Sequence, residues 1–199
     1  MWAEKLRISP VVPLVLAVLL MIFPPVLLLA ILSAALLHEA GHYAALRWMK
    51  GTVKSLSITQ FGAEMEVEGR LSYRQELLLA AAGPSVNLLL AAVLSQLGAR
   101  WELCYLFGGV HLVLGLFNLL PVLPLDGGML LWNAASWCLG PFIADRISAW
   151  VGISSALLLT GAALWMLWQG GSPFLLLAAF GLLRVPLGQI GLVKRQQRG

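Results

Sequence analysis

Long apolar runs are the feature that most constrains this chain. Of its 199 residues, 60% are hydrophobic and 11% are charged, whereas soluble domains carry about 25% charged residues. A soluble fold with so few polar side chains could not cover its surface, but lipid accepts an apolar surface when helices satisfy the backbone. Because each crossing needs about 20 apolar residues, we predict an all-α polytopic membrane protein with about six transmembrane helices.

Prolines and glycines set the boundaries of the predicted spans. The Pro24-Pro25 pair interrupts the first apolar run, because proline fits poorly inside a helix. The stretch Gly170–Pro173 predicts a turn before the last run. We expect one membrane-embedded domain over residues 1–199, with a core at about 26–130 and accessory spans at about 8–23, 147–168 and 173–191. The core spans are about 26–49, 77–98 and 102–121, and a short helical stretch precedes the fifth span.

Basic residues lie between the apolar runs and near the chain ends, and they give a formal net charge of +4. No basic stripe with interleaved aromatic residues occurs, so nucleic-acid binding is not expected. Cytoplasmic loops of membrane proteins are enriched in Lys and Arg. With the N-terminus inside, Arg100 is the one basic residue on the outer side of the predicted topology. We therefore predict a multi-pass protein of the cell membrane with both termini in the cytoplasm.

Residues 55–69 alternate apolar and polar side chains, as Leu56/Ile58 and Met65/Val67 illustrate. This period of two is typical of strands, and Phe61-Gly62 can form the turn. The pattern predicts a small β-hairpin at the cytoplasmic membrane interface, with a polar loop as the alternative. If the hairpin forms, its exposed edge strand is suited to pair with an extended substrate.

The second span contains His38-Glu39-Ala40-Gly41-His42. Helical positions i and i+4 lie on one face, so both imidazoles can bind one metal ion. Glu39 is placed to contact a metal-activated water rather than the metal. Two histidines and a glutamate are costly inside a membrane unless they have partners, which favours a zinc site over a chance occurrence of the motif.

Zinc in catalytic sites has three protein ligands, so a third ligand is required. Asp126 lies in the irregular Pro/Gly segment 118–128, and non-helical backbone at membrane depth is tolerated where it lines a wet cavity. As an alternative, Asp126 caps a helix that starts near Gly127. His111 also competes for the ligand role, although a hydrogen-bonded packing histidine, or one lining the water path, is the favoured interpretation. We favour Asp126 as the third ligand.

Three segments together, His38–His42, Gly83–Asn87 and Asn118–Gly128, have the patterns H-E-x-G-H, G-P-x-x-N and N-x-x-P-x-x-P-L-D-G-G. Their order and spacing resemble the site-2 protease family of intramembrane zinc metalloproteases, peptidase family M50. The resemblance covers roughly residues 26–130. Within the family, the chain looks most like the branch of the bacterial stage IV sporulation protease, which processes a membrane-associated pro-sigma factor.

The resemblance implies a fold, an activity and a set of site residues. It implies an intramembrane zinc endopeptidase that performs regulated proteolysis of a membrane-tethered regulatory protein of the pro-sigma or anti-sigma type, bound as an extended strand. Membrane regulatory proteins are implied as further partners. The resemblance implies that Asn87 has either a structural role or a role in positioning the substrate. The implied zinc ligands are His38, His42 and Asp126, with Glu39 as the base and Asn118 orienting substrate or stabilising the oxyanion.

Two other functions use the same residue types. A membrane transporter also places His, Asp and Asn inside the bilayer, but transporters often have inverted repeats with matching broken helices. We find no second copy of the His/Glu cluster or of segment 118–128. An inactive protease-like scaffold is the other alternative, and such proteins usually lose the glutamate or a ligand, which are all present here.

Overall fold

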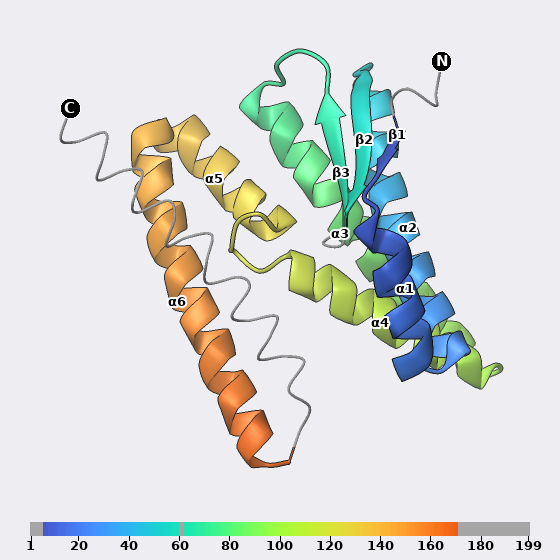
Figure 1. Ribbon diagram of the computed structural model, residues 1–199. Helices are drawn as coiled ribbons and strands as arrows, with labels where there is room; N and C mark the ends of the chain where they lie inside the picture. The colour runs from blue at the N-terminus through green and yellow to red at the C-terminus, as the bar shows by residue number, and fades with distance from the viewer. Residues whose placement is uncertain (1–5, 60–61, 171–199) are drawn as a thin grey trace. The chain divides into compact units, whose positions relative to one another are not determined.

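The computed structural model describes residues 6–59 and 62–170, and this part of the chain is mostly helical (Figure 1). It divides into two compact units, residues up to Ser72 with Ala82–Phe117, and Tyr73–Ala81 with the residues from Asn118 onward. In chain order the elements are β1 (Leu6–Ile8), α1 (Val11–Ile22), α2 (Pro25–Trp48), β2 (Val53–Thr59), β3 (Gly62–Val67), α3 (Tyr73–Leu97), α4 (Glu102–Asn118), α5 (Asp126–Leu139) and α6 (Pro141–Trp168).

Three of the described helices are long and apolar enough to cross a membrane: α2 with 24 residues, α3 with 25 and α6 with 28. Because a helix rises 1.5 Å per residue, about 20 residues cover the hydrocarbon core. The apolar helices α1 and α4 are shorter, with 12 and 17 residues. The structure thus confirms a mostly helical chain with several apolar helices. The predicted span at 173–191 lies outside the described residues.

The predicted break at Pro24-Pro25 is confirmed, since α1 ends at Ile22 and α2 begins at Pro25. The predicted start of the first span near Ile8 is wrong. Residues Leu6–Ile8 form strand β1 instead, because their backbone pairs with β2. The helix that follows is therefore shorter than the predicted span. At the other end of the chain, α6 begins at Pro141, several residues before the predicted start of the fifth span.

The predicted hairpin is confirmed as an antiparallel pair. Strands β2 and β3 align Leu56 with Met65 and Val53 with Val67. Residues 60–61, where part of the predicted turn falls, lie outside the described ranges. Strand β1 was not predicted, and it pairs with β2 in parallel to give the order β1-β2-β3. In the described sheet, β3 is therefore an edge strand.

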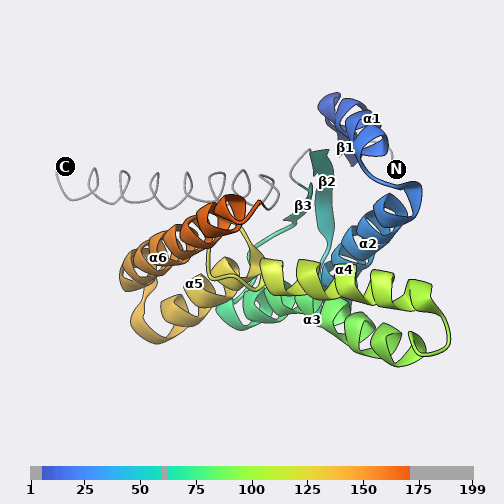
Figure 2. The same ribbon diagram turned by 90° about the horizontal axis from the view of Figure 1, so that it is seen from below.

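Small residues allow the helices of the first unit to pack closely. A Cβ atom added at Gly41 of α2 would lie 2.9 Å from the Ala82 carbonyl oxygen of α3. A Cβ added at Gly108 or Gly115 of α4 would lie 3.2 Å from a side-chain atom of α3, and Figure 2 shows α3 and α4 side by side. Close helix contact through small residues is common in membranes, where packing rather than water drives association.

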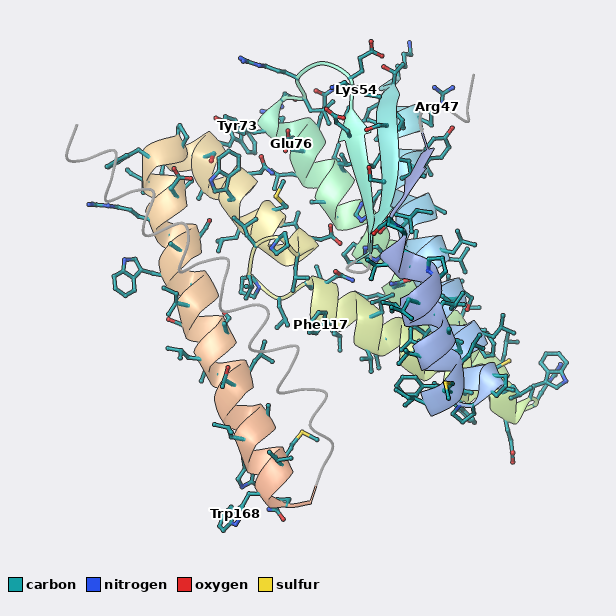
Figure 3. The ribbon with its side chains drawn as sticks, in the orientation of Figure 1. Arg47, Lys54, Tyr73, Glu76, Phe117 and Trp168 are labelled. Carbon is teal, nitrogen blue, oxygen red and sulfur yellow. The ribbon has the colours of Figure 1, made fainter. Side chains whose placement is uncertain are left out.

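The second unit is organised around α5 and α6, which are joined by Gly140. This residue has a φ of 85°, a conformation that favours glycine, and it allows one helix to follow the other directly. Polar contacts fix α5 in place: the Trp132 indole donates to Asp145 at 2.7 Å, and the Asn133 amide donates to Glu76 at 3.4 Å. Figure 3 shows Glu76 near the start of α3. Asn133 is buried and the other three side chains are half-buried, and polar groups removed from water in this way need hydrogen-bond partners.

Candidate metal centre

Two imidazoles one helical turn apart converge on α2. His38 is buried and His42 is half-buried, and their Nε2 atoms lie 3.1 Å apart. The ring centroids are 4.7 Å apart and the ring planes meet at 80°, so the rings meet edge to face rather than stacking. The spacing of four residues predicts this shared face, and the structure places both rings on it.

The separation of these nitrogens fits a shared metal ion. Two zinc–nitrogen bonds of about 2.0–2.1 Å at a tetrahedral angle place their nitrogens about 3.3 Å apart, close to the observed separation. A hydrogen bond between the two rings would also explain this distance, but it requires one Nε2 to carry a proton. A metal ion would replace that proton and use both lone pairs. The residues present therefore fit the donor set of a zinc site.

The backbone of α3 lies directly against this pair. A Cβ atom added at Gly83 would overlap Nε2 of His42 and would lie 2.7 Å from Nε2 of His38. The position therefore has room for no side chain, because the ring nitrogens occupy the space where a methyl group would stand. The G-P-x-x-N pattern indicates a close helix contact here, but the sequence does not say that the contact is with the histidine nitrogens.

Asn87 and His111 continue the site away from these nitrogens. The Asn87 amide lies 3.1 Å from Nδ1 of His38 and 3.0 Å from Nδ1 of His111. Asn87 and His111 are 0% and 2% exposed. His111 is thus the hydrogen-bonded, buried histidine that the sequence analysis favoured. Its link to His38 through Asn87 was missed, since three separate helices contribute to it.

The remaining predicted site residues lie at helix ends or on the neighbouring position of α2. Glu39 follows His38 and is half-buried, and it has an interaction partner in the structure. Basic side chains lie where α2 ends and the sheet begins: Arg47 is in the last turn of α2 and Lys54 is on β2 (Figure 3). Lys54 forms an exposed ion pair with Glu66 across the hairpin at 2.6 Å.

Asn118 and Asp126 flank the irregular segment of the second unit. Asn118 is the last residue of α4 and Asp126 is the first residue of α5. The helix N-cap is Leu125, so the alternative in which Asp126 caps α5 is wrong. Asp126 instead belongs to the first turn, where backbone N–H groups favour a negative charge.

Two glycines hold that segment against α5. A Cβ at Gly127 would overlap the Leu119 carbonyl group, and one at Gly128 would overlap the backbone nitrogen of Leu123. The backbone of this segment therefore approaches α5 closely at both glycines. Because both contacts are with backbone, no side-chain rotation relieves them. The position of Asp126 relative to segment 119–123 is consequently fixed by packing.

Comparisons with known proteins agree with this chemistry. Residues 94–161 match the model of peptidase family M50. The chain is 33% identical over 144 residues to a putative zinc metalloprotease of Synechocystis sp., which covers 63% of this chain and 38% of that protein. It is 31% identical over 146 residues to a zinc metalloprotease of Methanocaldococcus jannaschii (69% and 42%). It is 33% identical over 111 residues to stage IV sporulation protein FB of Bacillus subtilis (53% and 38%).

The matched region spans less than half the length of these curated relatives. The fold is similar to the solved site-2 protease from Methanocaldococcus jannaschii, with a TM-score of 0.66, 24% identity, and coverage of 93% of this chain and 91% of that one. The relatives' names give zinc as the metal. The chain belongs to peptidase family M50.

Proposed function

We propose that the chain is an intramembrane zinc endopeptidase in which His38, His42 and Asp126 bind one zinc ion. The observation that carries this proposal is the 3.1 Å separation of the two Nε2 atoms on a helix long enough to cross a membrane. Supporting it, two imidazoles and one carboxylate are ligand types that zinc takes in catalytic sites, where a fourth position stays open for water. Zinc metalloproteases among the relatives support the choice of metal.

Zinc supplies Lewis-acid chemistry at such a site, lowering the pKa of water and polarising a carbonyl oxygen. In our proposal the Glu39 carboxylate takes a proton from the attacking water and later delivers it to the leaving amine. The Asn118 amide donates a hydrogen bond to the carbonyl oxygen of the scissile peptide, or orients the substrate beside it. Peptide hydrolysis then needs no covalent attachment to the protein.

The substrate in this proposal binds as an extended strand. A helix keeps its carbonyl groups in internal hydrogen bonds, so a helical substrate cannot present them for attack. Strand β3 is an edge of the described sheet, and an edge strand supplies backbone groups that pair with an added strand. The sheet belongs to the same unit as His38 and His42, which supports β3 as the pairing strand.

For the substrate class, we infer a membrane-tethered regulatory protein of the pro-sigma or anti-sigma type, with membrane regulatory proteins as further partners. The support is the resemblance of the three motifs and the similarity to a stage IV sporulation protein. We further infer a location in the cell membrane with both termini in the cytoplasm. Arg47, Lys50 and Lys54 cluster where α2 meets the sheet, as expected of a cytoplasmic loop. A single membrane-embedded domain remains our prediction.

The test compares wild type with Glu39→Gln in a bacterial host, using Glu102→Gln as a matched control. Glu102 is exposed at the start of α4. Mass spectrometry of new N-termini in membrane proteins should find fragments made by wild type and by the control but absent with Glu39→Gln. The purified Glu39→Gln protein should retain zinc. Identical fragments from all three proteins would overturn the proposed role of Glu39.

A further inference from the structure

Three buried side chains from three helices form a continuous hydrogen-bonded chain. His38 of α2, Asn87 of α3 and His111 of α4 are joined at 3.1 Å and 3.0 Å. Their exposed fractions are 6%, 0% and 2%. In an apolar interior the polar atoms of these three side chains need hydrogen-bond partners, since an unpaired buried group costs free energy. The three side chains therefore adopt hydrogen-bonding states that are compatible with one another.

Metal binding dictates which state His38 adopts. A neutral imidazole has one protonated nitrogen and one with a free lone pair. If Nε2 gives its lone pair to a metal ion, Nδ1 must carry the proton, and the group facing Nδ1 must then accept a hydrogen bond. The group facing Nδ1 of His38 is the Asn87 amide. Only its carbonyl oxygen can accept.

The structure places the amide nitrogen of Asn87 toward His38 and its oxygen toward His111. Rotating the amide by half a turn exchanges these atoms within the same volume, and the two arrangements differ in their hydrogen bonds rather than in shape. In the reversed arrangement the oxygen accepts from Nδ1–H of His38. The nitrogen then donates to Nδ1 of His111, so His111 must carry its proton on Nε2.

We propose that Asn87 and His111 are positioning residues that hold His38 in its metal-binding state through this reversed amide arrangement. The inference rests on the proposed function, in which His38 binds zinc through Nε2. Asn87 orients the His38 ring and fixes its proton on Nδ1. His111 in turn fixes Asn87, because its Nδ1 accepts from the amide nitrogen and thereby keeps the oxygen facing His38.

Nitrogen-15 NMR of the zinc-loaded protein in detergent micelles tests the proton positions directly. The chain contains three histidines, so a histidine-labelled sample gives six ring-nitrogen signals, and His111→Gln assigns one ring by difference. We expect His111 to be protonated on Nε2 and His38 on Nδ1. A proton on Nδ1 of His111 in the zinc-loaded protein would overturn the proposal, because the amide oxygen would then face His111.

Zinc affinity tests the same chain independently of cleavage. Loss of the partner of a metal-binding histidine typically weakens metal affinity by about 10–100-fold. We expect Asn87→Ala to show a loss of this size and His111→Leu a loss in the same direction. His111→Gln should recover most of the affinity, because its side-chain oxygen can accept from Asn87. A role in packing alone would not distinguish glutamine from leucine in this way.

Asn133→Ala is the matched control, since Asn133 is 1% exposed on α5 and bonds to Glu76 and the Met129 carbonyl. It should bind zinc with wild-type affinity. Wild-type affinity in Asn87→Ala would refute the inference while leaving the zinc site standing. Absence of zinc from well-folded wild type would instead refute the proposed function, so the two failures are distinguishable.

Discussion

Gly83 of α3 lies so close to His42 of α2 that a Cβ atom at this glycine would overlap the Nε2 atom of the imidazole. The helix that contains the G-P-x-x-N pattern is therefore in direct contact with the proposed metal ligands. This contact ties the packing of α2 against α3 to the position of the imidazoles. A change in helix packing at this point is consequently a change in the metal site.

Gly83→Ala should weaken zinc binding without unfolding the protein. Alanine is favoured over glycine inside a helix by about 0.8–1.0 kcal/mol, so the helix itself gains stability. The added methyl group must displace the ring nitrogens of His38 and His42, and zinc retention during dialysis measures the consequence. Gly109→Ala is the control, because a Cβ at Gly109 of α4 meets no atom within 4 Å. Equal zinc retention in both variants would contradict the geometry.

Gly127→Ala should destabilise the first turn of α5. The added methyl group meets the backbone of Leu119, and overpacking of this kind costs about 1–3 kcal/mol. Thermal unfolding in detergent should show a lower melting temperature, together with weaker zinc binding through Asp126. Gly161→Ala on α6, where a Cβ meets open space, should not lower the melting temperature. The geometry is wrong if Gly127→Ala melts no earlier than this control.

Breaking the ion pair of the hairpin should have little effect on stability. The side chains of Lys54 and Glu66 are 61% and 55% exposed, and exposed pairs contribute about 0–1 kcal/mol. Lys54→Ala should therefore melt within about 1 kcal/mol of wild type and bind zinc normally. A large loss of stability would show that this end of the sheet is held by its charges rather than by backbone pairing.

Removal of zinc should lower thermal stability. A ligand that binds only the folded state stabilises it by about 2.7 kcal/mol at a concentration 100 times its dissociation constant. Chelation should therefore lower the melting temperature of wild type, and added zinc should restore it. His42→Ala should melt at the same temperature with and without the chelator. A shift of equal size in both proteins would mean that the metal effect arises elsewhere.

Local patterns account for much of the fold. Apolar runs predict the helices, Pro24-Pro25 predicts the break between α1 and α2, and alternation predicts the pairing of β2 with β3. Strand β1 was missed because its three residues are too few to show a period, and a distant segment supplies its partner. Helix α6 begins before the predicted span because Gly140 and Pro141, rather than hydropathy, set its first residue.

In the candidate site too, local features could be predicted from the sequence, whereas contacts between distant segments could not. The spacing of His38 and His42 on one helix predicts their convergence, because local geometry alone sets it. The contact of Gly83 with their nitrogens, and the chain through Asn87 to His111, depend on how α2, α3 and α4 pack. No periodicity within one segment encodes such contacts. A polar residue inside each apolar helix is the signal in the sequence, but it does not identify the partner.

The most direct test of the zinc site is the zinc content of detergent-purified protein at saturating zinc. Wild type should bind close to one zinc ion per chain, whereas His38→Ala and Asp126→Ala should bind none. His111→Ala should reach the wild-type plateau at a higher zinc concentration, because this residue positions a ligand without being one. Well-folded wild type without zinc, or a plateau that is lost in His111→Ala and kept in Asp126→Ala, would contradict the proposed ligand set.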